Sequence, residues 1–192
     1  AYFMEYGLRA RPRETAAFDA PQIGTFLHFL LENVTRDVLA EGGFAAVEQE
    51  ELHRLVRRYT ERYVEQELHN FQNRNARFRY LFARLRTTAY AVIDQVAAEL
   101  RCSDFVPMAF ELSFGGKNGA LSAVTISEPD GELRVGGKVD RVDGWLHDGR
   151  LYLRVVDYKS GRKSFDLANV RMGLDIQMLL YLFTLQKEGA RY

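Results

Sequence analysis

The spacing of apolar residues changes once along the chain, near residue 104, and this change limits the folds that are possible. Before it, apolar residues recur every three to four positions, which predicts three amphipathic helices, over about residues 21–41, 47–70 and 78–101. After it come four strand-like segments, at residues 108–114, 121–127, 133–146 and 151–159. Short connections between them favour antiparallel hairpins. A last helix is expected from about Leu167 onward.

The size and composition of the chain favour one globular unit. With 192 residues it can bury one ordinary core, so we expect a single domain over residues 1–192, with a mainly helical section over 1–104 and a sheet with a helix over 105–192. The formal net charge of zero gives no general attraction to nucleic acid, so a DNA site would need a local basic surface or metal ions.

The single cysteine, Cys102, excludes an internal disulfide and fits a reducing compartment, so a cytoplasmic location is expected. No apolar run approaches the roughly 18 residues of a membrane span, and we expect no membrane contact. The chain starts at Ala1, and its last predicted helix is still running near Arg191. We therefore expect a piece of a larger protein.

An acid and a lysine end the last predicted strand and give the clearest functional signal of the sequence. Strand side chains alternate, so Asp157 and Lys159 lie on one face. In a hydrolytic metal site Asp157 would bind the ion, while Lys159 would polarise the attacking water and stabilise charge on a phosphate. The alternative is a strand end that reaches solvent, where the two residues form a simple ion pair.

A second carboxylate, Asp140, lies on the preceding strand. In a regular strand Lys138 and Val142 share its face, whereas Arg141 and Asp143 share the other. We predict that Asp140 is the metal ligand and that Asp143 is a surface charge or an arginine-paired charge. Two carboxylates on neighbouring strands suit Mg²⁺, which prefers oxygen ligands and keeps several waters.

Four further polar residues could join this site, and each also has a structural interpretation. His28 lies beside the apolar stripe of the first helix, where most histidines are simply half-buried; as a ligand it would make Mn²⁺ plausible as well. Gln177 and Tyr181 are one turn apart on a helix that is apolar nearly all round over residues 176–185, which predicts deep burial. A buried Gln177 must bond either to backbone or to the site. Glu111 could support the ligands, although structural pairing is the more common use.

Together these segments resemble the PD-(D/E)XK nucleases, and more narrowly the RecB-type exonuclease domain found in the B subunit of AddAB-type helicase–nucleases. Four segments carry the resemblance, in the family's order: Gly24-Thr-Phe-Leu-His28, Gly137-Lys-Val-Asp-Arg-Val-Asp143, Val156-Asp-Tyr-Lys159 and Gln177-Met-Leu-Leu-Tyr181. The resemblance implies a mixed α/β fold with a restriction-endonuclease-like core, in which helices flank a central mixed sheet and a helical section precedes it. It also implies a Mg²⁺-dependent DNA exonuclease acting on single strands in double-strand-break repair and recombination.

The resemblance assigns roles to seven residues. The implied metal ligands, one of them a backbone carbonyl, are His28, Asp140, Asp157 and the carbonyl of Tyr158. The implied catalytic residues, led by the lysine, are Lys159, Asp157, Asp140 and, on the last helix, the pair Gln177 and Tyr181.

The resemblance also implies partners: a single strand of DNA and a helicase subunit or helicase domains of a larger complex. Related B subunits carry four cysteines for an iron–sulfur cluster, which Cys102 alone cannot hold, so such a cluster is possible only in the full-length protein. Two alternatives stay open. One is a catalytically silent DNA-binding or scaffold module of the same fold, and the other is a free-standing RecB-like or CRISPR-associated nuclease.

Overall fold

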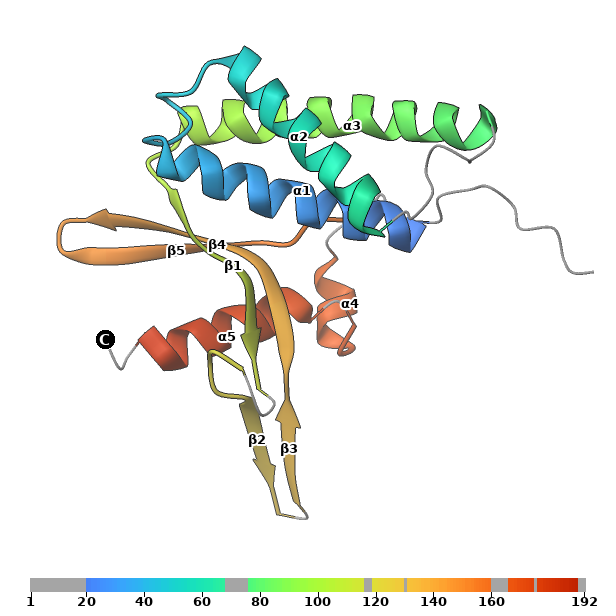
Figure 1. Cartoon of the computed structure of the whole chain (residues 1–192). Helices are drawn as coiled ribbons and strands as arrows, with labels where there is room; N and C mark the ends of the chain where they lie inside the picture. The colour runs from blue at the N-terminus through green and yellow to red at the C-terminus, as the bar shows by residue number, and fades with distance from the viewer. Residues whose placement is uncertain are drawn as a thin grey trace, which may run out of the picture.

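The computed structural model describes residues 20–67, 76–115, 119–129, 131–159, 166–174 and 176–189. Three helices, α1 (Ala20–Ala40), α2 (Gln49–Glu67) and α3 (Ala76–Arg101), form one layer above a sheet (Figure 1). Their apolar stripes meet in the larger of two hydrophobic clusters, which is why the helical period was readable in the sequence. None of the described helices is long and apolar enough to cross a membrane.

The main sheet contains three antiparallel strands in the order β1 (Val106–Phe114), β4 (Gly137–His147) and β5 (Arg150–Val156). A separate hairpin, β2 (Val124–Glu128) and β3 (Gly131–Val135), lies at the end of β1 and β4 that is far from the helices (Figure 1). The mixed α/β class is confirmed, and the named strand pairs are antiparallel.

The segment predicted as one strand over residues 133–146 is two strands, β3 and β4, with a break at Gly136. The break has a steric cause, because Gly115 and Gly136 approach each other closely. A Cβ at Gly115, where φ is +70°, would lie 2.7 Å from the Cα of Gly136. Only glycine tolerates both the conformation and the approach. The chain therefore leaves the β2–β3 hairpin and enters the main sheet at this point.

The helix predicted from Leu167 onward is also divided, so that expectation was wrong. The chain forms α4 (Leu167–Arg171) and α5 (Gln177–Gly189). Gly173 has a φ of +77°, and the N–H of Leu174 donates to the carbonyl of Asn169 at 2.8 Å. This is the geometry by which a glycine in the left-handed region ends a helix.

Helix α5 lies on the opposite side of the sheet from α1–α3 (Figure 1). Its contact with the sheet forms the second hydrophobic cluster, composed of Phe114, Val139, Val142, Tyr181 and Leu185. The predicted deep burial of this helix was wrong, because Leu182 and Phe183 are 45% and 56% exposed. Only one side of α5 meets the sheet.

Candidate metal centre

The side-chain alternation of β4 breaks where the candidate ligand Asp140 lies. Val139 and Val142 both pack in the cluster beneath the sheet, although residues three apart in a regular strand point to opposite faces. Asp140 instead approaches His28 of α1, in the helical layer. The prediction that Asp140 shares the face of Val142 was therefore wrong, because it assumed a regular strand.

The neighbouring strand is irregular at the same level. Glu111 of β1 has a φ of +50°, a conformation that is uncommon for a residue other than glycine and costs on the order of 1–3 kcal/mol. The register pairs the residues on either side of Glu111 with those on either side of Asp140, so the two acids face each other across the strands. Strained backbone of this kind concentrates at functional sites, where it re-aims a side chain.

Three ligand atoms converge as a result. His28 Nδ1 lies 3.5 Å from Glu111 Oε1 and 3.5 Å from Asp140 Oδ1, and one ligand atom from each residue lies within 4.8 Å of the other two. Neighbouring ligands of an octahedral Mg²⁺ are about 3 Å apart, given metal–oxygen distances of about 2.1 Å. Two carboxylate oxygens and an imidazole nitrogen at this spacing fit a divalent cation.

Two contacts to the backbone of Tyr158 complete the surroundings of this group. The N–H of Tyr158 donates to Asp140 Oδ2 at 2.6 Å, and its carbonyl oxygen lies 3.3 Å from His28 Nε2. Burial raises the pKa of Asp140, and the hydrogen bond from Tyr158 offsets part of that rise. The carbonyl predicted to bind metal thus lies beside the ligand group, next to the ring of His28.

Asp157 and Lys159 follow the last strand instead of ending it, because β5 stops at Val156. They nevertheless lie on one side, as predicted: Lys159 Nζ is 2.8 Å from Asp157 Oδ2. This hydrogen bond raises the pKa of Lys159, so the ammonium is the stable form. Asp157 does not belong to the converging group of three. It adjoins that group in the chain, because the next residue, Tyr158, donates its backbone N–H to Asp140.

Gln177 and Tyr181 connect α5 to both strands of the site. The Gln177 side-chain amide donates to Asp157 Oδ1 at 3.2 Å and to the hydroxyl of Tyr181. The Tyr181 hydroxyl in turn donates to the Lys138 carbonyl at 2.7 Å. The half-buried glutamine is thus satisfied by a site carboxylate and a tyrosine, and it fixes the position of Asp157 relative to β4.

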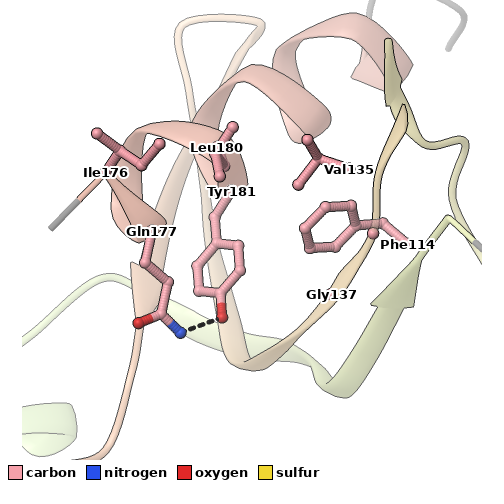
Figure 2. A pocket seen from close by; sticks show the side chains of 8 residues that line it. Phe114, Val135, Gly137, Ile176, Gln177, Leu180 and Tyr181 are labelled. Carbon is pink, nitrogen blue, oxygen red and sulfur yellow. Dashed lines mark hydrogen bonds between the residues drawn. The ribbon is translucent and has the colours of Figure 1, made fainter. Parts of the chain in front are cut away.

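An open pocket of about 430 Å³ borders this helix (Figure 2). Eight residues line it: Phe114, Val135, Gly136, Gly137, Ile176, Gln177, Leu180 and Tyr181. In Figure 2, Gln177 and Tyr181 occupy one side and Phe114 and Val135 the other. The pocket therefore lies on the α5 side of β4 and is one side chain away from Asp157, through Gln177.

Asp143 belongs to a buried charge network, which confirms the prediction of an arginine-paired charge and excludes a surface position. Its carboxylate is 0% exposed. Asp143 Oδ1 lies 2.8 Å from Arg141 Nε, and these two atoms form an ion pair without the alignment of a hydrogen bond. Arg154 donates to Oδ2 at 2.7 Å and also pairs with Glu99 of α3. Arg141 donates to the Tyr158 hydroxyl at 2.7 Å, while burial raises the pKa of that phenol to about 12.

Glu111 is the residue that sequence reasoning undervalued. Its Oε1 faces His28, and its Oε2 binds Lys138 Nζ at 2.6 Å. The only signal in the sequence was an acid inside a strand-like segment, which structural pairing explains equally well. The polar loop at residues 160–165 lies outside the described residues, as does the start of the chain.

The sequence is similar to those of known nucleases. The sequence profile of the PD-(D/E)XK nuclease superfamily matches residues 1–192. The B subunit of the ATP-dependent helicase/deoxyribonuclease of Caldanaerobacter subterraneus subsp. tengcongensis is 32% identical over 184 residues, which cover 95% of this chain and 16% of the relative. The protein of the same name from Acetivibrio thermocellus is 31% identical over 191 residues, covering 98% and 17%. The chain thus spans about a sixth of the length of these relatives.

Proposed function

The chain belongs to the PD-(D/E)XK nuclease superfamily, and from this membership we propose that it forms one nuclease domain that hydrolyses phosphodiester bonds of single-stranded DNA with the help of a divalent metal ion. The observation that carries the proposal is the convergence of His28, Glu111 and Asp140 beside the Asp157–Lys159 pair. A purely structural pairing would not require two acids to face one imidazole across a strained strand.

In this proposal His28, Glu111 and Asp140 hold the metal, and Asp157 completes the set from the adjoining backbone segment, together with the carbonyl of Tyr158. Mg²⁺ or Mn²⁺ would act as a Lewis acid and lower the pKa of a bound water. The carboxyl groups and the imidazole fix the position of that ion relative to the DNA phosphate.

Lys159 acts as a cation and not as a base, because its pKa is raised by the hydrogen bond to Asp157. It therefore orients the attacking water and stabilises the negative charge that develops on the phosphate. Gln177 and Tyr181 keep the Asp157 carboxylate in place, since they connect it to the backbone of Lys138.

We further propose that this domain is the nuclease part of a helicase–nuclease and digests, as an exonuclease, a strand delivered by helicase domains or by a helicase subunit. The names of the relatives support this, and so does the small share of their length that the chain covers. The proposal includes a role in double-strand-break repair and recombination in the cytoplasm, as the resemblance to AddAB-type helicase–nucleases implies. The full ligand group argues against a catalytically silent scaffold.

The test is digestion of single-stranded DNA in the presence of Mg²⁺ or Mn²⁺. Asp140→Asn and Lys159→Ala should each lower the rate by about 100-fold or more, because the first removes a ligand of the metal ion and the second removes the cation aimed at the reacting charge. Asp94→Asn is the matched control, since Asp94 of α3 also binds a histidine, at 2.9 Å, but that histidine is His53 of α2 and not a residue of the candidate site. Equal rates in the wild type and all three variants would contradict the proposed site.

A further inference from the structure

We propose that Tyr158 is a positioning residue whose phenol, held by a charge chain of the buried Arg141 and Asp143 and the partly exposed Arg154, sets the affinity of the site for its metal ion. This inference rests on the proposed metal site. It assigns a function to a buried ion-pair network that no step of the hydrolysis uses.

First, residues 157–159 pair with no strand among the residues that the structure describes. The pairing between β4 and β5 ends where Arg141 faces Val156. The next three residues carry the carboxylate, the backbone groups and the ammonium of the site, so their orientation must come from side-chain contacts. Tyr158 is the central residue of the three, and its ring packs against the cluster of α1–α3.

Second, the backbone of Tyr158 contacts two of the three converging ligands. Its N–H donates to Asp140 Oδ2 at 2.6 Å, and its carbonyl oxygen lies 3.3 Å from His28 Nε2. Its ring also meets the ring of His28 edge-on, with centroids 5.8 Å apart. A rotation of Tyr158 would therefore move Asp140 and His28. It would also reorient the side chains of Asp157 and Lys159, which are its neighbours in the chain.

Third, the ring of Tyr158 is tied to groups that cannot easily move. Its hydroxyl accepts a hydrogen bond from Arg141 Nη1 at 2.7 Å. Arg141 is 1% exposed and Asp143 is 0% exposed, and the two make a close ion pair. Asp143 also binds Arg154, which reaches Glu99 of α3 at 2.7 Å. Neither Arg141 nor Asp143 can leave its partner without remaining buried and unpaired, which is strongly unfavourable.

The geometry therefore gives a continuous connection from helix α3 to the peptide groups beside the metal ligands. Contacts that orient metal ligands from outside the ligand set typically change metal affinity by roughly 10- to 100-fold when they are removed. The phenol–arginine hydrogen bond is one such contact, although it acts through the backbone of Tyr158 and not through the ligand side chain itself.

The decisive variant is Tyr158→Phe, which keeps the ring and the backbone and removes only the hydroxyl. Titration calorimetry with Mn²⁺ alone, without DNA, should give a dissociation constant roughly 10-fold higher than that of the wild type. DNA cleavage should recover to near the wild-type rate when Mn²⁺ is saturating, because no reacting group has been changed.

Tyr59→Phe is the matched control. Tyr59 lies in the same helical cluster, and its hydroxyl donates to Asp37 Oδ2 at 2.8 Å and accepts from Arg58, neither of which is a proposed metal ligand. It should lower the melting temperature to a similar extent and leave Mn²⁺ binding unchanged. A second test variant, Arg141→Lys, keeps a positive charge for Asp143 but shortens the reach to Tyr158, and it should weaken Mn²⁺ binding as well.

The outcomes separate this inference from the function on which it rests. If the wild type binds no Mn²⁺, the proposed metal site itself fails. If the wild type binds Mn²⁺ and Tyr158→Phe binds it equally well, only the positioning role is overturned. A loss of cleavage that saturating Mn²⁺ does not restore would likewise contradict a role in metal affinity.

Discussion

The substitution Asp143→Asn should strongly destabilise the protein, although Asp143 is not one of the proposed metal ligands. It removes the negative charge that faces Arg141, which is 1% exposed, and Arg154, which is 28% exposed. Removal of one partner from a buried ion pair typically costs about 3–5 kcal/mol, because the remaining charge stays buried. The asparagine oxygen still accepts one hydrogen bond, which returns about 1 kcal/mol. We therefore expect a net loss of about 2–4 kcal/mol.

The assay is urea denaturation followed by tryptophan fluorescence and circular dichroism, with the midpoint expected to fall and the slope to stay unchanged. Asp37→Asn is the control, because Asp37 makes the same kind of pair with Arg58 in a more exposed place. Exposed pairs contribute about 1 kcal/mol or less, so this variant should change stability little. If Asp143→Asn costs no more than Asp37→Asn, the arginines are solvated and the reasoning is refuted.

Two further outcomes are expected. Glu111→Gly should raise the free energy of unfolding by about 1 kcal/mol, because glycine tolerates the φ of +50°, and it should weaken Mn²⁺ binding. Thermal melting measures the first effect and calorimetry the second. A stability loss would show that the released strain is smaller than the contribution of the ion pair between Glu111 and Lys138. Because burial raises the pKa of Asp140 and a metal needs the ionised carboxylate, protons compete at a higher pH than at an ordinary aspartate. Mn²⁺ affinity should therefore begin to fall at a higher pH than it would with an ordinary aspartate ligand, and an Asp140→Asn variant should lack this contribution of Asp140.

The parts of the fold that were predictable from sequence are those in which a regular pattern meets a continuous partner. The stripes of α1, α2 and α3 face one shared cluster, so their period of three to four is preserved along nearly their whole length. The division between α4 and α5 was missed because Leu174 continues the apolar stripe, whereas the backbone is governed by Gly173. A single glycine outweighs several apolar neighbours when the chain must turn.

The candidate site shows the same limit. Asp157 and Lys159 were predicted to lie on one side, and in the structure Lys159 Nζ is 2.8 Å from Asp157 Oδ2. Side chains two residues apart still point to the same side here, although the strand has ended. Glu111 was not predicted to face His28, since its orientation depends on a positive φ that nothing in Phe110-Glu-Leu indicates. Which of these residues act on DNA stays a prediction until the variants are measured.

The two hydrophobic clusters of the protein lie on opposite sides of the sheet, and His28 belongs to a helix on one side, while Asp140 belongs to a strand that contributes to the cluster on the other. An ion bound by His28 and Asp140 would therefore connect the helical layer to the sheet. Metal binding would then make the contact between the helices and the sheet more rigid, and chelation of the metal would make it more mobile. Catalytic competence and the rigidity of this contact would therefore change together.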